Sequence, residues 1–287
     1  MSGLGAPWIP PGDVLLPRVL AADASGAATA WQQWQAAHAL DDVSWRTMRL
    51  LAAVIGRLDR LGIAAVDQPR LQGIRRYCWS NGQTKLARAL PSLAALQGAG
   101  LPLLVLKGGA AIATGDAQPA DRYVGDIDLL VAPEQAERAL DLLAAEGWQP
   151  QSGGSTARVK GRHMPRHHAV NLVRGKDGEL DLHWSFLLQT RAVGDAAALW
   201  AAAEPARLSG LAIRCPAPPW RLLQALTQGA QWSSGNAADW AIDALALLRR
   251  PGLDWTAFGR EVAARRLEAL VGVTLGFLAR QVGVALP

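Results

Sequence analysis

The segment at residues 125–131, with the sequence GDIDLLV, carries two aspartates, Asp126 and Asp128, inside an apolar run. If this run is a strand, both carboxylates project to the same face, because side chains alternate between the two faces of a sheet. Upstream, the sequence LVLKGG at residues 104–109 is typical of a buried strand that ends in a sharp turn. The two segments predict that this part of the chain has α/β structure.

The two aspartates also indicate chemistry, since adjacent carboxylates are costly to bury unless a positive charge lies between them. A divalent metal ion held against a phosphate-bearing substrate best fits this arrangement. An Asp-x-Asp pair also occurs on ordinary solvated strand edges. The neighbouring segments therefore have to support the metal interpretation.

The composition indicates a globular protein with an ample core. The chain has 287 residues, of which 50% are hydrophobic and 18% charged, which suits one large domain or two modest ones. The net charge of +5 is dispersed along the chain. Such a charge fits a phosphate-bearing ligand but is too weak to indicate nucleic acid by itself.

The sequence predicts a cytoplasmic protein that does not bind membranes. Its two cysteines, Cys78 and Cys215, lie far apart and are expected to be reduced structural thiols. The Gly- and Pro-rich start lacks the apolar segment of a signal peptide, and no later run is long and apolar enough to span a bilayer.

Hydrophobic periodicity divides the chain into three expected regions. They are an N-terminal helical region at residues 1–98, an α/β core at 99–215 and a C-terminal helical region at 216–287. Residues 1–27 are expected to be irregular. Outside the core, helices are predicted at 45–62, 71–77, 83–97, 220–232, 239–249 and 254–282.

A third carboxylate is expected on a later strand. Residues 168–173 and 179–184 alternate as paired strands around the turn GKDG at 175–178. Glu179, Asp181 and His183 then share one face of the second strand. If that strand lies beside the one with Asp126 and Asp128, Asp181 joins them to hold one or two Mg²⁺ ions, or serves as the base for an acceptor hydroxyl.

The densest basic stretch, RVKGRHMPRHH at residues 158–168, has two interpretations. It is either a solvated loop or a loop that grips substrate over the site. A metal site built from its histidines is not expected.

These motifs resemble the DNA polymerase beta-like nucleotidyltransferase superfamily, and more narrowly its group of uncharacterised bacterial nucleotidyltransferases. The resemblance rests on the LKG of residues 106–108, on Arg122 with GDIDLLV, and on LHW at 182–184, and it covers roughly residues 75–250. It implies an α+β fold, in which a small mixed-sheet core is flanked by helical regions.

The resemblance also implies roles for individual residues. Asp126, Asp128 and Asp181 are the expected metal ligands and catalytic residues. The triphosphate is expected to contact the residues of a second set, which are Lys107, Gly108, Gly109, Arg122 and His183; for His183 a structural hydrogen bond is the alternative. Superfamily members commonly have Ser after the first glycine, whereas this chain has Gly109.

The implied activity is transfer of a nucleotidyl group from an NTP, with ATP expected first, in the presence of Mg²⁺ or Mn²⁺. The acceptor is expected to be a small molecule or a peptide or protein, as in natural-product tailoring, with RNA ranked lower. The alternatives are phosphoryl transfer from the same site, toxin-like modification of tRNA or protein, and non-catalytic nucleotide binding.

Overall fold

The computed structural model describes residues 9, 11–189, 197–230 and 238–286. The chain forms two compact units. The helical unit comprises Met1–Ser80, Asp116–Tyr123 and Leu222–Pro287, and the sheet unit comprises Asn81–Gly115 and Val124–Arg221. Each unit is therefore assembled from segments that are separated in the sequence.

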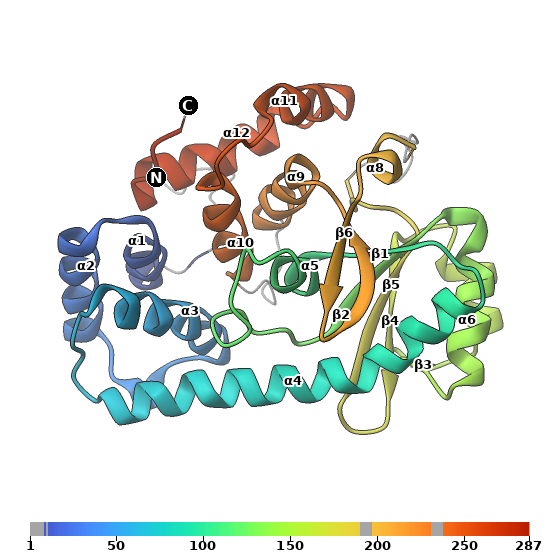
Figure 1. Cartoon of the computed structure of the whole chain (residues 1–287), viewed down its shortest axis with the longest axis horizontal. Coiled ribbons are helices and arrows are strands. Elements are labelled where there is room, and N and C mark those ends of the chain that lie inside the picture. Colours follow the sequence, from blue (N-terminus) through green and yellow to red (C-terminus); the bar gives the residue numbers. More distant parts are fainter. Residues whose placement is uncertain (1–8, 10, 190–196, 231–237, 287) are drawn as a thin grey trace. The chain divides into compact units, whose positions relative to one another are not determined.

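The sheet unit is built on a mixed five-stranded sheet (Figure 1). Its strands are β1 (Leu103–Val105), β2 (Ile127–Val131), β3 (Gln149–Pro150), β4 (Ala169–Arg174) and β5 (Gly178–His183), in the spatial order β1-β2-β5-β4-β3. β2 and β5 are parallel, whereas the other pairs are antiparallel. This arrangement confirms the predicted α+β fold with a mixed sheet.

The register of the central strands sets the position of the aspartates. β5 pairs with β4 through the predicted GKDG turn, and its other edge pairs with β2 so that Asp128 lies opposite Asp181. Leu180 and Leu182 are buried in the core on one face, so Asp181 and His183 project to the other. The strand alternation thus brings the predicted carboxylates together.

Short helices and a second, two-stranded sheet complete this unit. The helices are α5 (Lys107–Ala113), η3 (Pro133–Gln135), α6 (Ala136–Ala145), α7 (Thr156–Arg158), η4 (Val159–His163), α8 (Ala197–Ala201) and the start of α9 (Pro218–Gly229). The second sheet pairs β6 (Glu204–Leu208) with β7 (Leu211–Cys215). A hairpin forms there because Ser209 and Gly210 both adopt positive φ and reverse the chain.

The helical unit consists of segments from both ends of the chain. Its elements are η1 (Pro11–Val14), α1 (Leu15–Ala21), α2 (Ala24–Ala37), η2 (Leu40–Asp42), α3 (Trp45–Leu61), the first part of α4 (Gln68–Gly98), the rest of α9, α10 (Asp239–Leu248), α11 (Trp255–Ala264), α12 (Glu268–Phe277) and η5 (Leu278–Val282). Leu51, Val54 and Trp34 are fully buried in it, so the large Trp34 ring serves packing.

Three predictions outside the core were wrong. Residues 11–27 are largely helical, because Pro17 falls in the first turn of α1 and the Asp23 side chain caps α2. The two helices expected at 71–77 and 83–97 are one helix, α4. The helix expected at 254–282 is broken near Arg266, which has a φ of 54°.

α4 continues through Ser80, Asn81 and Gly82 although these residues have low helix propensity. Cys78 is packed in a cluster of the helical unit, and Leu86 and Leu93 are packed in the core of the sheet unit. Burial on both sides of the weak stretch holds the helix together, since tertiary packing supplies most helical stability. Among the described residues, no helix is both long and apolar enough to cross a membrane.

Candidate active site

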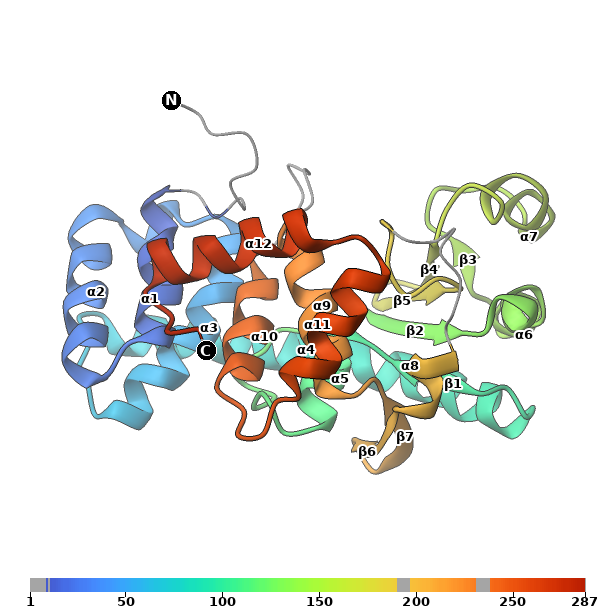
Figure 2. The same ribbon diagram turned by 90° about the horizontal axis from the view of Figure 1, so that it is seen from above.

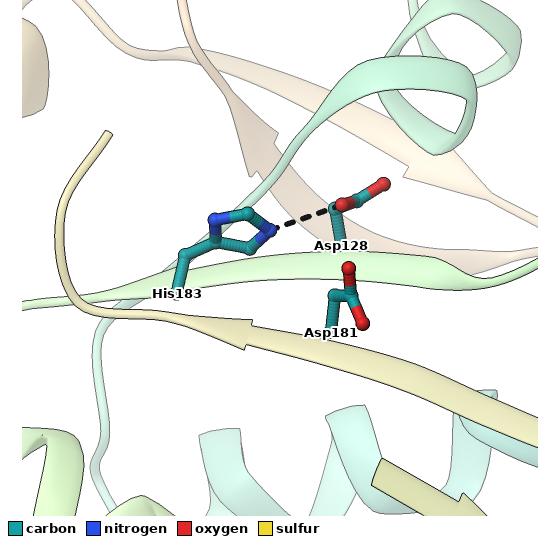
Figure 3. Close-up of side chains that lie close together, drawn as sticks. All are labelled: Asp128, Asp181 and His183. Atoms are coloured by element: carbon teal, nitrogen blue, oxygen red, sulfur yellow. Dashed lines mark hydrogen bonds and ion pairs between the residues drawn. The ribbon is translucent and has the colours of Figure 1, made fainter. Parts of the chain in front are cut away.

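Three side chains from β2 and β5 form the candidate active site. The carboxylates of Asp128 and Asp181 and the imidazole of His183 each offer a ligand atom, and these atoms lie within 4.8 Å of one another. Figure 3 shows the three side chains on the same side of the two strands. The parallel pairing of β2 with β5 creates this cluster, because it aligns Asp128 with Asp181 and Leu130 with His183.

His183 holds Asp128 in place. Its Nε2 lies 3.0 Å from Oδ1 of Asp128 (Figure 3), and burial lowers the pKa of the imidazole, so the ring is neutral and Nε2–H donates to the carboxylate. Nδ1 is then a buried acceptor with no hydrogen-bond partner among the described residues. A buried acceptor of this kind fits a water molecule or substrate hydroxyl.

Lys107, the first residue of α5, forms an ion pair with Asp128. Burial disfavours the charged ammonium, but Asp128, Asp126 and Asp181 outweigh it and raise the lysine pKa. The pKa of Asp128 is lowered in turn: burial opposes the charged carboxylate, and Lys107 and His183 more than offset it. Asp128 therefore stays ionised.

Asp181 has the opposite shift. Burial, together with the negative charges of Asp128 and Asp126, raises its pKa to about 8 against 3.8 for an ordinary aspartate. Asp126 directly precedes β2 and is partly exposed. The ammonium of Lys107 thus faces the carboxylates of both Asp128 and Asp181, and this surplus of negative charge, like the oxygen-rich donor set, fits a divalent cation such as Mg²⁺.

The two glycines of the predicted phosphate turn, Gly108 and Gly109, are buried in α5. A Cβ on Gly109 would lie 2.8 Å from Cγ1 of Val105 in β1. Close packing of α5 on β1 therefore requires glycine at this position. The helix begins at Lys107, which itself adopts a φ of 46°.

Arg122 lies in the helical unit, where its guanidinium contacts two aspartates of α10. Its Nε and Nη2 donate to Asp243 at 2.8 and 2.9 Å, and Nη1 lies 3.2 Å from Asp239 and donates to the carbonyl of Tyr123. These contacts give Arg122 a structural role. The structure thus brings together Lys107, Asp128, Asp181 and His183 from the predicted set.

His168, the last residue of the basic stretch 158–168, is a neighbour of the site that was not among the predicted site residues. Its ring centroid lies 5.3 Å from that of His183, and burial and the nearby positive groups lower its pKa to about 4. The signal was present in the pairing of β4 with β5, which aligns Ala169 with His183 and so brings the preceding residue close.

Paired carboxylates on neighbouring parallel strands, with the lysine of α5 beside one of them, are the arrangement that the motifs predicted for a nucleotidyltransferase. The sequence profile of the uncharacterised nucleotidyltransferase family matches residues 43–283, and the chain belongs to that family. This match confirms the family suggested by the motifs. The curated proteins contain no significant match.

Two solved structures are similar in fold. One is the antibiotic-resistance factor ANT(2'')-Ia, with 15% sequence identity and a TM-score of 0.42 over 68% of this chain and 93% of that chain. The other is an antigenic nucleotidyltransferase-like protein from Paracoccidioides brasiliensis, with 15% identity and a TM-score of 0.34 over 66% and 92%.

Proposed function

We propose that this enzyme is a Mg²⁺-dependent nucleotidyltransferase that moves a nucleotidyl group from an NTP to a small-molecule or peptide or protein acceptor, with ATP the first nucleotide to test. The observation that carries the proposal is the buried cluster of Asp128, Asp181 and His183, in which negative charge exceeds positive charge. A protein without a cation to bind has no reason to keep this arrangement, since unpaired buried carboxylates are destabilising.

Asp128, Asp181 and Asp126 would hold the metal ion. When bound, Mg²⁺ neutralises charge on the triphosphate and lowers the pKa of an acceptor hydroxyl. His183 keeps Asp128 oriented through its hydrogen bond, and the ammonium of Lys107 supplies positive charge for the phosphates. These residues prepare the site before any substrate binds, which is how positioning lowers a reaction barrier.

Asp181 is also suited to accept a proton from the acceptor hydroxyl. It is partly exposed, so an acceptor can approach it, and bound Mg²⁺ would favour the ionised form of the carboxylate, which is the form that accepts a proton. Ligand and base are alternative roles for this carboxylate. Replacement by asparagine separates them, because a neutral amide oxygen can still coordinate Mg²⁺ but accepts no proton.

The other residues predicted to contact the triphosphate are Gly108, Gly109 and Arg122. Gly108 and Gly109 would allow the triphosphate to approach the backbone of α5 closely. Arg122 as a phosphate ligand stays a prediction, because its described hydrogen bonds go to Asp239, Asp243 and a carbonyl.

We also place the enzyme in the cytoplasm. Cys78 and Cys215 are free and buried, which suits a reducing compartment. Fractionation of the native host would test the location directly.

The test is incubation with α-labelled and γ-labelled NTPs, Mg²⁺ and candidate acceptors, followed by intact-mass analysis of the acceptor. Transfer of the α-label with the mass of a nucleotide supports the proposal, and transfer of the γ-label with the mass of a phosphate replaces it with phosphoryl transfer. Asp128→Asn is the inactive control. Binding of Mg²⁺ and NTP without transfer to any class of acceptor would indicate a nucleotide-binding protein, and growth arrest on expression, abolished by Asp128→Asn, would indicate a toxin.

A further inference from the structure

A cavity of about 260 Å³ lies in the sheet unit beside β4. Its lining includes Ser152 and Gly153, Arg158, Arg162, and the rings of His163 and His167. Pockets for drug-sized ligands measure roughly 300–1,000 Å³, so this cavity suits a compact group. The segment of α7 and η4 that forms one wall stands next to β3 and β4 (Figure 2).

The charges in the lining are all of one sign. No carboxylate lines the cavity, and neither Arg158 nor Arg162 has an acidic partner among the described residues. Lys160, between them, is already used: its ammonium lies 2.7 Å from Asp141 of α6. Lys160 therefore attaches the segment to α6, and the guanidinium groups of Arg158 and Arg162 are left to bind another anion.

The wall that carries these arginines is folded. Val159 is buried in the core of the sheet unit and Met164 packs against it, while the Ser155 hydroxyl accepts a hydrogen bond from the backbone N–H of Arg158. Gly154 has a φ of 95°, and a Cβ there would lie 3.4 Å from Cδ of Arg158. The arginine stems thus extend from a fixed backbone, which reduces the entropy lost on binding.

Two stacked imidazoles form another part of the wall. The rings of His163 and His167 lie 3.9 Å apart with an interplanar angle of 11°. Nε2 of His163 donates to the carbonyl of Ala169 at 2.8 Å, and Trp184 donates from Nε1 to the carbonyl of His167 at the same distance. The pair is therefore fixed to the start of β4 and to the residue that follows β5.

These contacts connect the cavity to the active site. Trp184 directly follows His183, and His168, the neighbour of His167, lies with its ring 5.3 Å from that of His183. Val170 lines the cavity and packs in the core with Leu182, so the cavity opens on the sheet face opposite to Asp181. A group bound in it is close to the end of β5 but is not the reacting group.

We propose that this cavity binds the phosphate group of an acceptor molecule, with Arg158 and Arg162 as its ligands. Two guanidinium groups without acidic partners match the charge and the oxygen geometry of a phosphate. Because the cavity and Asp181 lie on opposite faces of the sheet, an acceptor held here by a remote phosphate would extend around the end of β5 to present its hydroxyl for reaction. The anion site follows from the cavity alone, whereas the assignment to the acceptor rests on the proposed nucleotidyl transfer.

Calorimetric titration with inorganic phosphate, without nucleotide and with a metal chelator, tests the anion site. We expect phosphate to bind the unmodified chain, and the dissociation constant to rise about tenfold for each arginine replaced in Arg158→Gln and Arg162→Gln, since each loses charge-assisted hydrogen bonds. The matched control is Arg166→Gln, an exposed arginine of the same segment outside the cavity lining. Circular dichroism spectra check that the variants fold.

Absence of phosphate binding, or an equal loss in Arg166→Gln, would overturn the inference. Asp128→Asn separates the two proposals: phosphate binding should survive in it, and Mg²⁺-dependent NTP binding should survive in the double variant of Arg158 and Arg162. If the unmodified chain and all the variants bind phosphate but none binds NTP, the result would count against the proposed function only.

The source of the phosphate is identified by repeating the titration with phosphate monoesters, such as glycerol phosphate, sugar phosphates and phosphoethanolamine. A monoester that binds more tightly than inorganic phosphate identifies an acceptor-borne group and supports the assignment. Binding of inorganic phosphate more tightly than every monoester would overturn the assignment to the acceptor.

Discussion

Two buried carboxylate clusters, one in each unit, differ in their charge balance. In the helical unit, Asp239 and Asp243 meet the guanidinium groups of Arg122 and Arg49, so two negative charges face two positive ones. Arg49 also lies 4.8 Å above the ring of Tyr123. In the sheet unit, the carboxylates of Asp128 and Asp181 face one ammonium group, that of Lys107, and a neutral histidine.

The comparison shows how a structural cluster is distinguished from a site that binds a cation. Both clusters contain carboxylates that would be destabilising if buried alone. In the helical unit, the guanidinium groups of Arg122 and Arg49 neutralise the carboxylates, so we call this the balanced cluster. The sheet unit does so incompletely, and burial together with the remaining negative charge raises the pKa of Asp181 to about 8. The cluster of the sheet unit, which we call the unbalanced cluster, therefore needs a positive charge from outside the chain.

The largest effect is expected from Arg122→Met, which breaks the balanced cluster. Removing one partner of a buried ion pair typically lowers the free energy of unfolding by about 3–5 kcal/mol. Chemical denaturation would measure the loss, and Arg70→Met, which breaks an exposed pair with Asp41, should cost less than about 1 kcal/mol. A stable Arg122→Met protein with weakened NTP binding would instead support a phosphate-binding role for Arg122.

Asp128→Asn should reduce transfer roughly 100- to 1,000-fold, equivalent to about 2.7–4 kcal/mol in the barrier. It removes the carboxylate that pairs with both Lys107 and His183 in the unbalanced cluster. Initial rates of label incorporation measure the effect. Asp177→Asn, in the turn between β4 and β5, is the matched control, and equal rates in the two variants would refute the assigned site.

Mg²⁺ should stabilise the protein through the unbalanced cluster alone. At ten times its dissociation constant, the ion should raise the free energy of unfolding by about 1.4 kcal/mol. We expect Asp128→Ala, which removes the ligand oxygen, to abolish this increase and Asp243→Asn to retain it, each measured against the same protein with a chelator. An increase that depends on Asp243 would reverse the distinction between the two clusters.

The last prediction concerns pH, in protein freed of metal by a chelator. The pKa of Asp181 is 3.8 when unfolded and about 8 when folded, so the folded state retains a proton that the unfolded chain has released. The contribution of Asp181 to stability is full below pH 3.8 and falls as pH rises toward 8, by no more than about 1.4 kcal/mol per pH unit.

The difference in unfolding free energy between the unmodified chain and Asp181→Asn isolates this contribution from other titrating groups. That difference should decrease as pH rises through this range. A difference that does not vary with pH would show that the carboxylate is not buried among like charges. Saturating Mg²⁺ should weaken the dependence, because the bound ion favours the charged form.

Sequence patterns predicted the sheet unit well because its signals are local. Alternation in residues 179–184 placed Asp181 on the face of β5 that bears His183, and the GKDG turn fixed the hairpin with β4. The likeness of the motifs to a family supplied the pairing with β2, which is not local. That Asp128 lies opposite Asp181 is a consequence of register that only the structure shows.

The balanced cluster could not be predicted, because its partners are far apart in the sequence. Arg122 lies next to the GDIDLLV segment, but its acidic partners come 117 and 121 residues later. The position of Arg122 near the motif suggested a role at the site, but the structure shows Arg122 bound to two aspartates of the helical unit. The continuity of α4 was missed for a similar reason, since propensity at Ser80 and Gly82 says nothing about burial on either side.

The backbone at Lys107 limits which residues can replace it. Its φ of 46° costs about 1 kcal/mol for a residue with a side chain and nothing for glycine, and the next two residues are glycines. A library of variants at this position would therefore show two opposing trends. Glycine should give the most relaxed turn and arginine or lysine the most active enzyme, so that selection for stability and selection for activity recover different residues.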